Sequence, residues 1–196
     1  MYLEKLKELI SPPSIPIENN ISPNYKNEFK IDFPNDYINL IELYGTGYFN
    51  NCLMVYNPYS SNEYANIYKM VLQTNEQYIH HKQNDAITHL SDMLEKHFSQ
   101  NNKIVMPSGV IVDGIGYLFD FFPNVPGLIP WGEINGEITL FWEYDKAFNG
   151  IIVYSREGAY SKYNMTTTEF LYKLFTKKIN GIISEYIIDT PCFIQQ

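Results

Sequence analysis

The spacing of apolar residues changes along this chain, and that change limits the fold more than any other feature. Up to residue 99, apolar side chains recur every three or four positions, as they do on one face of a helix. From about residue 110 they alternate with polar side chains, as they do in a strand with one buried face. Helices that are segregated in this way from an antiparallel meander favour an α+β fold.

Three helical stretches are predicted before the meander. The first is a short amphipathic helix with apolar positions at Leu3, Leu6, Leu9 and Ile10. The second covers 34–44, because Pro34 is compatible with a first helical turn and Gly45 is suited to a left-handed C-cap. The third stretch, 62–99, carries two apolar stripes separated by a break in the polar run 80–85.

The meander is centred on 138–144, which follows Asn135-Gly136, a strong signal for a hairpin turn. Alternation within this strand predicts a core row and an opposite row that is solvated or binds a partner. The core row is Ile138, Leu140, Trp142 and Tyr144, and the opposite row is Thr139, Phe141, Glu143 and Asp145. The other predicted strands are 48–56, 110–114, 116–122, 150–156 and 158–163.

A last helix is predicted to begin at Thr166, because Thr166 and Glu169 have the spacing of a capping box, and to end at Gly181. The tail after it could add a strand. We therefore expect an N-terminal helix and loop (1–32) packed on a domain (33–181), followed by a C-terminal extension (182–196).

Catalytic and metal sites are weakly indicated. Four carboxylates, Glu133, Glu137, Glu143 and Asp145, suggest a glycosidase pair. However, Glu143 and Asp145 would share one face of any alternating strand, so a solvated or binding face is the favoured interpretation. The tryptophans Trp131 and Trp142 are predicted to be core residues rather than ligand-stacking platforms.

The remaining reactive side chains have no catalytic or metal-binding spacing. His80, His81, His89 and His97 are interpreted as surface or helix-end residues. Cys52 and Cys192 match no metal or redox motif and are expected to be reduced. The sequence thus predicts no catalytic residue, no metal and no cofactor.

Three segments resemble the SMI1/KNR4 family, also called the SUKH superfamily. They are FPNDYINLIELYGTG (33–47), GLIPWGEINGEITLFWEYD (127–145) and GIIVYSREGAYSKYNMTTTEFLYKLFTKKING (150–181). Glu137 departs from the aspartate that the family usually carries after Asn-Gly, but it keeps the charge. The family signature positions in this sequence are Pro34, Tyr37, Gly45, Pro130, Trp131, Gly132, Asn135, Gly136 and Trp142.

This resemblance implies a central, mostly antiparallel sheet wrapped by helices. It also implies a function, because many bacterial members of the family look like immunity proteins that neutralise toxins, often nucleases or deaminases. Fungal members regulate cell-wall synthesis through protein contacts. Neither function requires an active site in this chain.

The charge balance indicates which partners the chain would bind. The formal net charge is −8 and Arg156 is the one arginine, so direct nucleic-acid binding is not expected. An acidic surface instead suits a basic protein, such as a toxin nuclease or deaminase domain. The candidate contacts are the acids and a tyrosine of the central hairpin, Glu133, Glu137, Glu143, Tyr144 and Asp145.

The leading hypothesis is therefore a cytoplasmic immunity protein that occludes a cognate toxin, because no signal peptide or apolar membrane span is evident. One alternative is an intracellular regulatory or scaffold module that binds other proteins. A carboxylate-dependent hydrolase is a third. The sequence leaves the partner's identity and the oligomeric state open.

Overall fold

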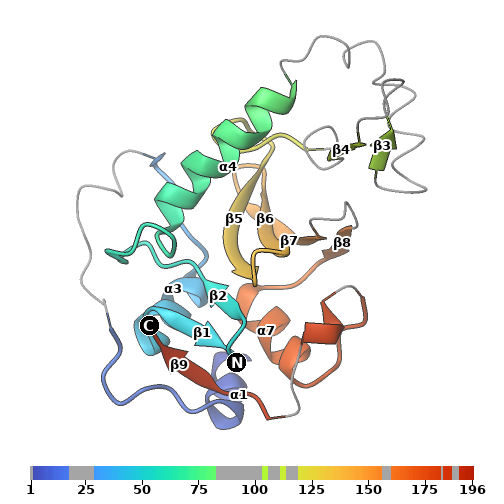
Figure 1. Cartoon of the computed structure of the whole chain (residues 1–196). Helices are drawn as coiled ribbons and strands as arrows, with labels where there is room; N and C mark the ends of the chain where they lie inside the picture. Colours follow the sequence, from blue (N-terminus) through green and yellow to red (C-terminus); the bar gives the residue numbers. More distant parts are fainter. Residues whose placement is uncertain are drawn as a thin grey trace.

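The structure is a computed structural model of the whole chain (Figure 1). It describes residues 2–17, 29–82, 103–105, 111–113, 119–155, 160–181, 183–186 and 190–196. Of the predicted break at 80–85, residues 80–82 still belong to a helix and residues 83–85 lie outside the described residues, as does all of 83–99. Of the predicted strand at 116–122, only 119–122 are described, and the prediction is wrong there, because they form a single bridge at Phe121 and the start of a turn.

A seven-stranded antiparallel sheet forms the centre of the described part of the chain, in the order β8-β7-β6-β5-β2-β1-β9. A separate antiparallel pair is made by β3 and β4. The strands are β1 (Gly47–Phe49), β2 (Leu53–Val55), β3 (Lys103–Val105), β4 (Ile111–Asp113), β5 (Gly127–Ile134), β6 (Ile138–Tyr144), β7 (Phe148–Ser155), β8 (Tyr160–Tyr163) and β9 (Phe193–Gln195). The predicted antiparallel meander is confirmed, and the C-terminal tail does supply a strand, β9.

The segment 48–56 was predicted to be one strand, and this prediction is wrong. It folds as a hairpin in which β1 and β2 flank a turn at Asn50 and Asn51. Both asparagines have positive φ, 51° and 60°. Asparagine is one of the few residues besides glycine that tolerates this left-handed conformation, so two adjacent asparagines can turn the chain inside an apolar run.

The described α-helices are α1 (Tyr2–Leu9), α3 (Asn35–Tyr44), α4 (Ile67–Lys82) and α7 (Thr167–Phe175), and a short 3-10 helix, η2, covers Ser184–Tyr186. Figure 1 shows α3, α7 and α1 gathered beside the β1–β2–β9 half of the sheet, whereas α4 runs along β5. An α+β fold with a central sheet and flanking helices is therefore confirmed.

The last helix ends earlier than predicted, at Phe175 rather than Gly181. Lys177 adopts a left-handed φ of 55°, and the N–H of Lys178 donates to the carbonyl of Lys173 at 2.7 Å. This is the hydrogen-bond pattern of a Schellman C-cap, in which a lysine takes the position that glycine usually occupies.

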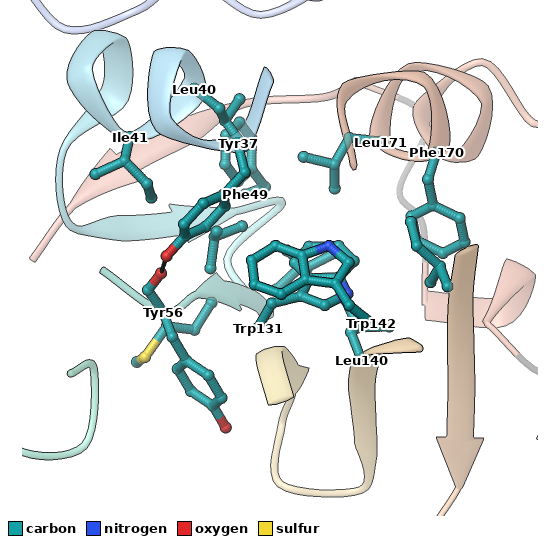
Figure 2. Packing of buried hydrophobic residues seen from close by; sticks show 14 of the residues in the cluster. Tyr37, Leu40, Ile41, Phe49, Tyr56, Trp131, Leu140, Trp142, Phe170 and Leu171 are labelled. Carbon is teal, nitrogen blue, oxygen red and sulfur yellow. Dashed lines mark hydrogen bonds between the residues drawn. The ribbon is translucent and has the colours of Figure 1, made fainter. Parts of the chain in front are cut away.

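The main core lies where one face of the sheet meets α3 and α7 (Figure 2). The ring of Trp142 stacks on that of Trp131, with centroids 5.8 Å apart, and meets the edge of Tyr37 at 4.7 Å. Trp131 also contacts Phe170 of α7, at 6.0 Å. The indole N–H of Trp142 donates to Thr167 Oγ1 at 3.0 Å, so α7 is tied to the sheet by a buried polar contact as well as by packing.

A second, smaller core covers part of the opposite face of the sheet. Phe141 was predicted to lie in the solvated or binding row of β6, but it is 1% exposed, and this prediction is wrong. The segment around Phe121 packs against it, and β5 and β7 contribute neighbours on the same face. The cluster consists of Phe121, Leu128, Phe141, Ile152 and Tyr154. Burial on both faces explains why simple alternation misplaced this residue.

The first turn of α7 is capped by a residue of another helix. Asp36 of α3 accepts hydrogen bonds from the backbone N–H of Thr168 at 2.8 Å and from its hydroxyl at 3.1 Å. The capping box contributes one weaker bond, from Glu169 N–H to Thr166 Oγ1 at 3.4 Å, while the Glu169 carboxylate pairs with Lys173 at 2.7 Å. Asp36 is therefore the stronger cap, and it fixes α3 to α7.

We expect Asp36→Ala to lower the free energy of unfolding by about 1–2 kcal/mol, because it removes both cap bonds at a partly buried site. Asp36→Asn retains an acceptor oxygen and should lose less. Urea denaturation followed by circular dichroism measures both variants. Equal stability of Asp36→Ala and the wild type would show that Thr166 alone suffices as the cap.

Buried tyrosines should make the fold sensitive to alkali. Burial raises the pKa of Tyr68 to about 12, with a smaller contribution from Tyr59, and it raises the pKa values of Tyr37 and Tyr44 well above the ordinary value. Tyrosine in the unfolded chain ionises near pH 10, so above about pH 10 the unfolded state loses protons that the folded state keeps. The contribution of these tyrosines to the free energy of unfolding is therefore fully present below about pH 10 and is lost as the pH rises above it.

The expected slope is up to about 1.4 kcal/mol per pH unit for each such tyrosine. Phenolate absorbance and circular dichroism should be followed together during an alkaline titration. The phenolate absorbance of the buried tyrosines should appear only at the pH at which the helical circular-dichroism signal is lost. Reversible ionisation of all tyrosines with the fold intact would contradict this prediction.

Candidate binding surface

The hairpin of β5 and β6 carries the five predicted contact residues, and the structure divides them between its two ends. Glu133 pairs in register with Thr139 near the turn, whereas Glu143 pairs with Leu128 near the other end. Asn135 and Gly136 make the turn with positive φ, 51° and 68°, as their sequence predicted. Since β6 rises about 3.3 Å per residue over its length, the two ends lie roughly 20 Å apart.

At the turn end, tyrosine hydroxyls hold two of the carboxylates. The hydroxyl of Tyr56 donates to Glu133 Oε2 at 3.1 Å, and that of Tyr186 donates to Glu137 Oε2 at 2.7 Å. Burial, followed by the charge of Glu133, raises the pKa of Tyr56, which therefore stays a protonated donor. We call Tyr56, Glu133, Glu137 and Tyr186 the turn-end cluster.

At the other end of the hairpin, the predicted residues do not form one surface. Glu143 makes an ion pair of 2.6 Å with Lys162 of β8. Tyr144 is half-buried on the core side, where its ring contacts Phe148 at 5.1 Å. Asp145 is exposed in the bend after β6, beyond the alternating strand that was predicted to place it beside Glu143.

The two carboxylates of the paired strands, Glu133 and Glu143, lie far apart. Glu143 of β6 lies opposite Leu128 of β5, which is five positions from Glu133 on the same strand, so the two carboxylates are separated by about 15 Å along the strands. Glycosidases need two carboxyl groups about 5–10 Å apart across a cleft. The turn-end carboxylates Glu133 and Glu137 instead accept hydrogen bonds from tyrosines, which fix the direction of their charge.

The tyrosines of the turn-end cluster were missed by sequence reasoning. Tyr56 and Glu133 are 77 residues apart, and Tyr186 and Glu137 are 49 residues apart. The high tyrosine content, 17 residues, was the available signal, but it does not identify which tyrosine meets which acid.

The residues of the predicted family signature occupy structural positions. Trp131 is the extra residue at a register shift between Pro130 and Gly132, so it points into the core with Trp142. A side chain at Gly132 would meet the carbonyl of Met54 of the neighbouring strand. Pro34 is the N-cap residue of α3, and the hydroxyl of Tyr37 donates to the carbonyl of Tyr56. Within the described residues, the indole N–H of Trp131 is buried without an acceptor.

Other candidate sites are poorly developed. Within the described ranges no three or more His, Cys, Asp or Glu side chains gather as a metal would require. His89 and His97 lie outside those ranges, and the side chains of His80 and His81 are not described. A solvent-open depression of about 260 Å³ between α1 and α3 is lined by Leu3, Glu4, Lys7, Asn39, Glu42 and Leu43. No helix in the described part of the chain has the length and apolarity to cross a membrane.

Together these features define an α+β protein with an aromatic core and an acidic hairpin end that tyrosines hold in place. Comparisons of the chain with protein-family models, characterised proteins and solved structures gave no match.

Proposed function

We propose that the protein binds a basic toxin domain and neutralises it by covering its active site, with no chemistry of its own. The observation that supports this function is the turn-end cluster, where Glu133 and Glu137 accept hydrogen bonds from Tyr56 and Tyr186 beside an exposed turn. Anions that are already oriented lose little side-chain entropy on binding, and the net charge of −8 favours encounter with a cation-rich partner.

The turn end is better suited to this function than the opposite end of the hairpin. Glu137 and the turn residues Asn135 and Gly136 are exposed. At the other end, Lys162 neutralises Glu143 and the ring of Tyr144 is packed against the core. We therefore assign the docking surface to the turn end and exclude Glu143 and Tyr144 from it.

The resemblance to SMI1/KNR4 proteins adds the class of partner, a toxin nuclease or deaminase. Such domains bind phosphate-rich substrates through Lys and Arg, and an acidic inhibitor would match that charge. A regulatory module that binds a cellular protein would use the same surface, and the experiment below separates the two functions.

The test is co-expression of this chain with the toxin domains encoded immediately upstream of its gene. A neutralised toxin should restore growth, and the purified pair should form a stable complex. Failure of every upstream toxin to be neutralised, together with capture of a non-toxin protein under native expression, would instead indicate the regulatory function.

Within such a complex, the double variant Glu133→Gln/Glu137→Gln should weaken binding by about tenfold or more, chiefly through slower association. Glu143→Gln/Asp145→Asn is the matched control, since it also removes two charges, at the other end of the same hairpin. Association rates measured across a salt series should fall steeply for the wild type and less steeply for the double variant. Equal losses in the double variant and the control would place the docking surface elsewhere.

A further inference from the structure

A row of side chains leads from the turn-end cluster to the edge strand β9 across one face of the sheet. Residues that pair directly in neighbouring antiparallel strands point to the same face. Glu133 of β5 pairs with Met54 of β2, and Met54 pairs with Tyr48 of β1. Tyr48 pairs in turn with Ile194 of β9. We call these four side chains the cross-strand row.

The cross-strand row lies on the face of the sheet opposite the main core. The ring of Phe193 contacts that of Phe49 at 4.8 Å and that of Tyr44 in α3 at 5.1 Å, so these rings are on the core side. Ile194 follows Phe193 in β9, and Tyr48 precedes Phe49 in β1. Because successive side chains of a strand alternate between faces, Ile194 and Tyr48 point away from the main core.

The β9 end of the cross-strand row is accessible. Ile194 is 52% exposed and Tyr48 is partly exposed. Met54 is buried and fills the position between Tyr48 and Glu133. Neighbouring strands lie about 4.8 Å apart, so Tyr48 lies about 10 Å and Ile194 about 14 Å from Glu133 across the sheet. One partner surface can therefore span the whole row.

The charged end of the row belongs to the turn-end cluster. The hydroxyl of Tyr56 donates to Glu133 at 3.1 Å. The N–H of Asn135 donates to the carbonyl of Cys52 at 3.2 Å, so the β5–β6 turn lies directly beside the β1–β2 turn. An acidic part and an apolar part are thus adjacent at the same end of the sheet.

We propose that Tyr48 and Ile194 form the apolar part of the docking surface for the basic toxin domain, beside the acidic part that Glu133 and Glu137 supply. This surface rests on the proposed function. The toxin places Lys or Arg side chains at the turn end and an aliphatic or aromatic side chain over Tyr48 and Ile194. Specific interfaces combine an apolar centre with a polar rim, and the carboxylates alone supply only the rim.

The two parts of the surface act on different steps of binding. Charges attract a partner before contact and raise the rate of encounter, and salt screens this attraction. Apolar contacts form only after the surfaces meet, so they slow dissociation and respond little to screening. Loss of the Ile194 side chain should therefore shorten the lifetime of the complex and leave the salt dependence of association unchanged.

The test uses the full chain in complex with a toxin domain that it neutralises, and surface plasmon resonance measures both rates across a salt series. Ile194→Ser should raise the dissociation rate about tenfold or more and change the association rate by less than about twofold. Leu72→Ser is the matched control, because Leu72 is a similarly exposed aliphatic residue, 46%, on α4, whose buried side chains pack into the main core. It should change neither rate. Urea denaturation checks that both variants keep the stability of the wild type.

A second measurement maps the surface on the wild-type chain. Hydroxyl-radical footprinting should show Tyr48 and Ile194 oxidised at least about twofold more slowly in the complex than in the free chain, because the centre of an interface is closed to solvent. Leu72 should be oxidised equally in both states.

The outcomes distinguish the apolar surface from the proposed function. A complex in which Ile194→Ser dissociates no faster than Leu72→Ser, or in which Tyr48 and Ile194 gain no protection, overturns the apolar surface and leaves toxin neutralisation standing. If no upstream toxin is bound or neutralised, the proposed function fails and the apolar surface fails with it.

Discussion

Replacement of Trp142 by alanine is expected to lower the free energy of unfolding by about 3–5 kcal/mol. The side chain is 2% exposed and lies at the centre of the main core. Its ring contacts Tyr37 at 4.7 Å, Phe148 at 5.2 Å and Trp131 at 5.8 Å. Alanine would leave a cavity among these rings and that of Phe33, and it would also remove the hydrogen bond to Thr167.

Urea denaturation measures this loss, and two further variants separate its causes. Trp142→Phe keeps an aromatic ring but loses the indole N–H, so it should be less damaging than alanine. Tyr64→Ala is the matched control for loss of an aromatic side chain, because Tyr64 is 76% exposed and should change stability by less than about 0.5 kcal/mol. A Trp142→Ala loss no larger than that of Tyr64→Ala would show that the core does not depend on this ring.

Replacement of Gly45 by alanine is expected to destabilise the protein by about 2–4 kcal/mol. Gly45 ends α3 with φ 72° and ψ −151°, a backbone conformation that essentially only glycine adopts. A Cβ at this position would lie 2.4 Å from the carbonyl oxygen of Ile17 and 2.8 Å from its nitrogen. These are backbone atoms, so relief requires movement of the N-terminal segment that pairs with Gly45.

Gly136→Ala is the matched control for this variant. Gly136 has a similar positive φ, 68°, but a Cβ there would have no neighbour within 4 Å. Alanine at Gly136 should therefore cost only the left-handed backbone conformation, about 1–2 kcal/mol. Equal losses for the two variants would show that the contact with Ile17 contributes nothing.

The conformation of Gly45 was only partly predictable from the local sequence. The sequence predicted a glycine C-cap after 34–44, and the structure has one at that residue. However, the predicted left-handed helical cap is wrong, because ψ is −151° and the chain leaves the helix in an extended direction. The parallel bridge between Ile17 and Gly45 accompanies this direction, and no local pattern near Gly45 could reveal a partner 28 residues earlier.

The β5–β6 hairpin likewise combines features that the sequence predicts with one that it does not. Its turn at Asn135-Gly136 and the core row Ile138, Leu140 and Trp142 were both predictable, because a glycine or asparagine turn and a period of two are local properties. The burial of Phe141 was not predictable, since it depends on a separate segment around Phe121 that packs on the second face of the sheet.

The sequence by itself determined the α+β class, the central meander and the rows of residues that face the main core. These follow from periodicity and turn chemistry within short windows of the chain. Only the tertiary structure decided which polar groups meet. Asp36 caps α7 across 132 residues, Tyr56 reaches Glu133 across 77, and Cys192 meets Asn50 across 142. Such contacts form because sheet register and helix packing bring distant segments together, and these depend on the whole chain rather than on the local pattern.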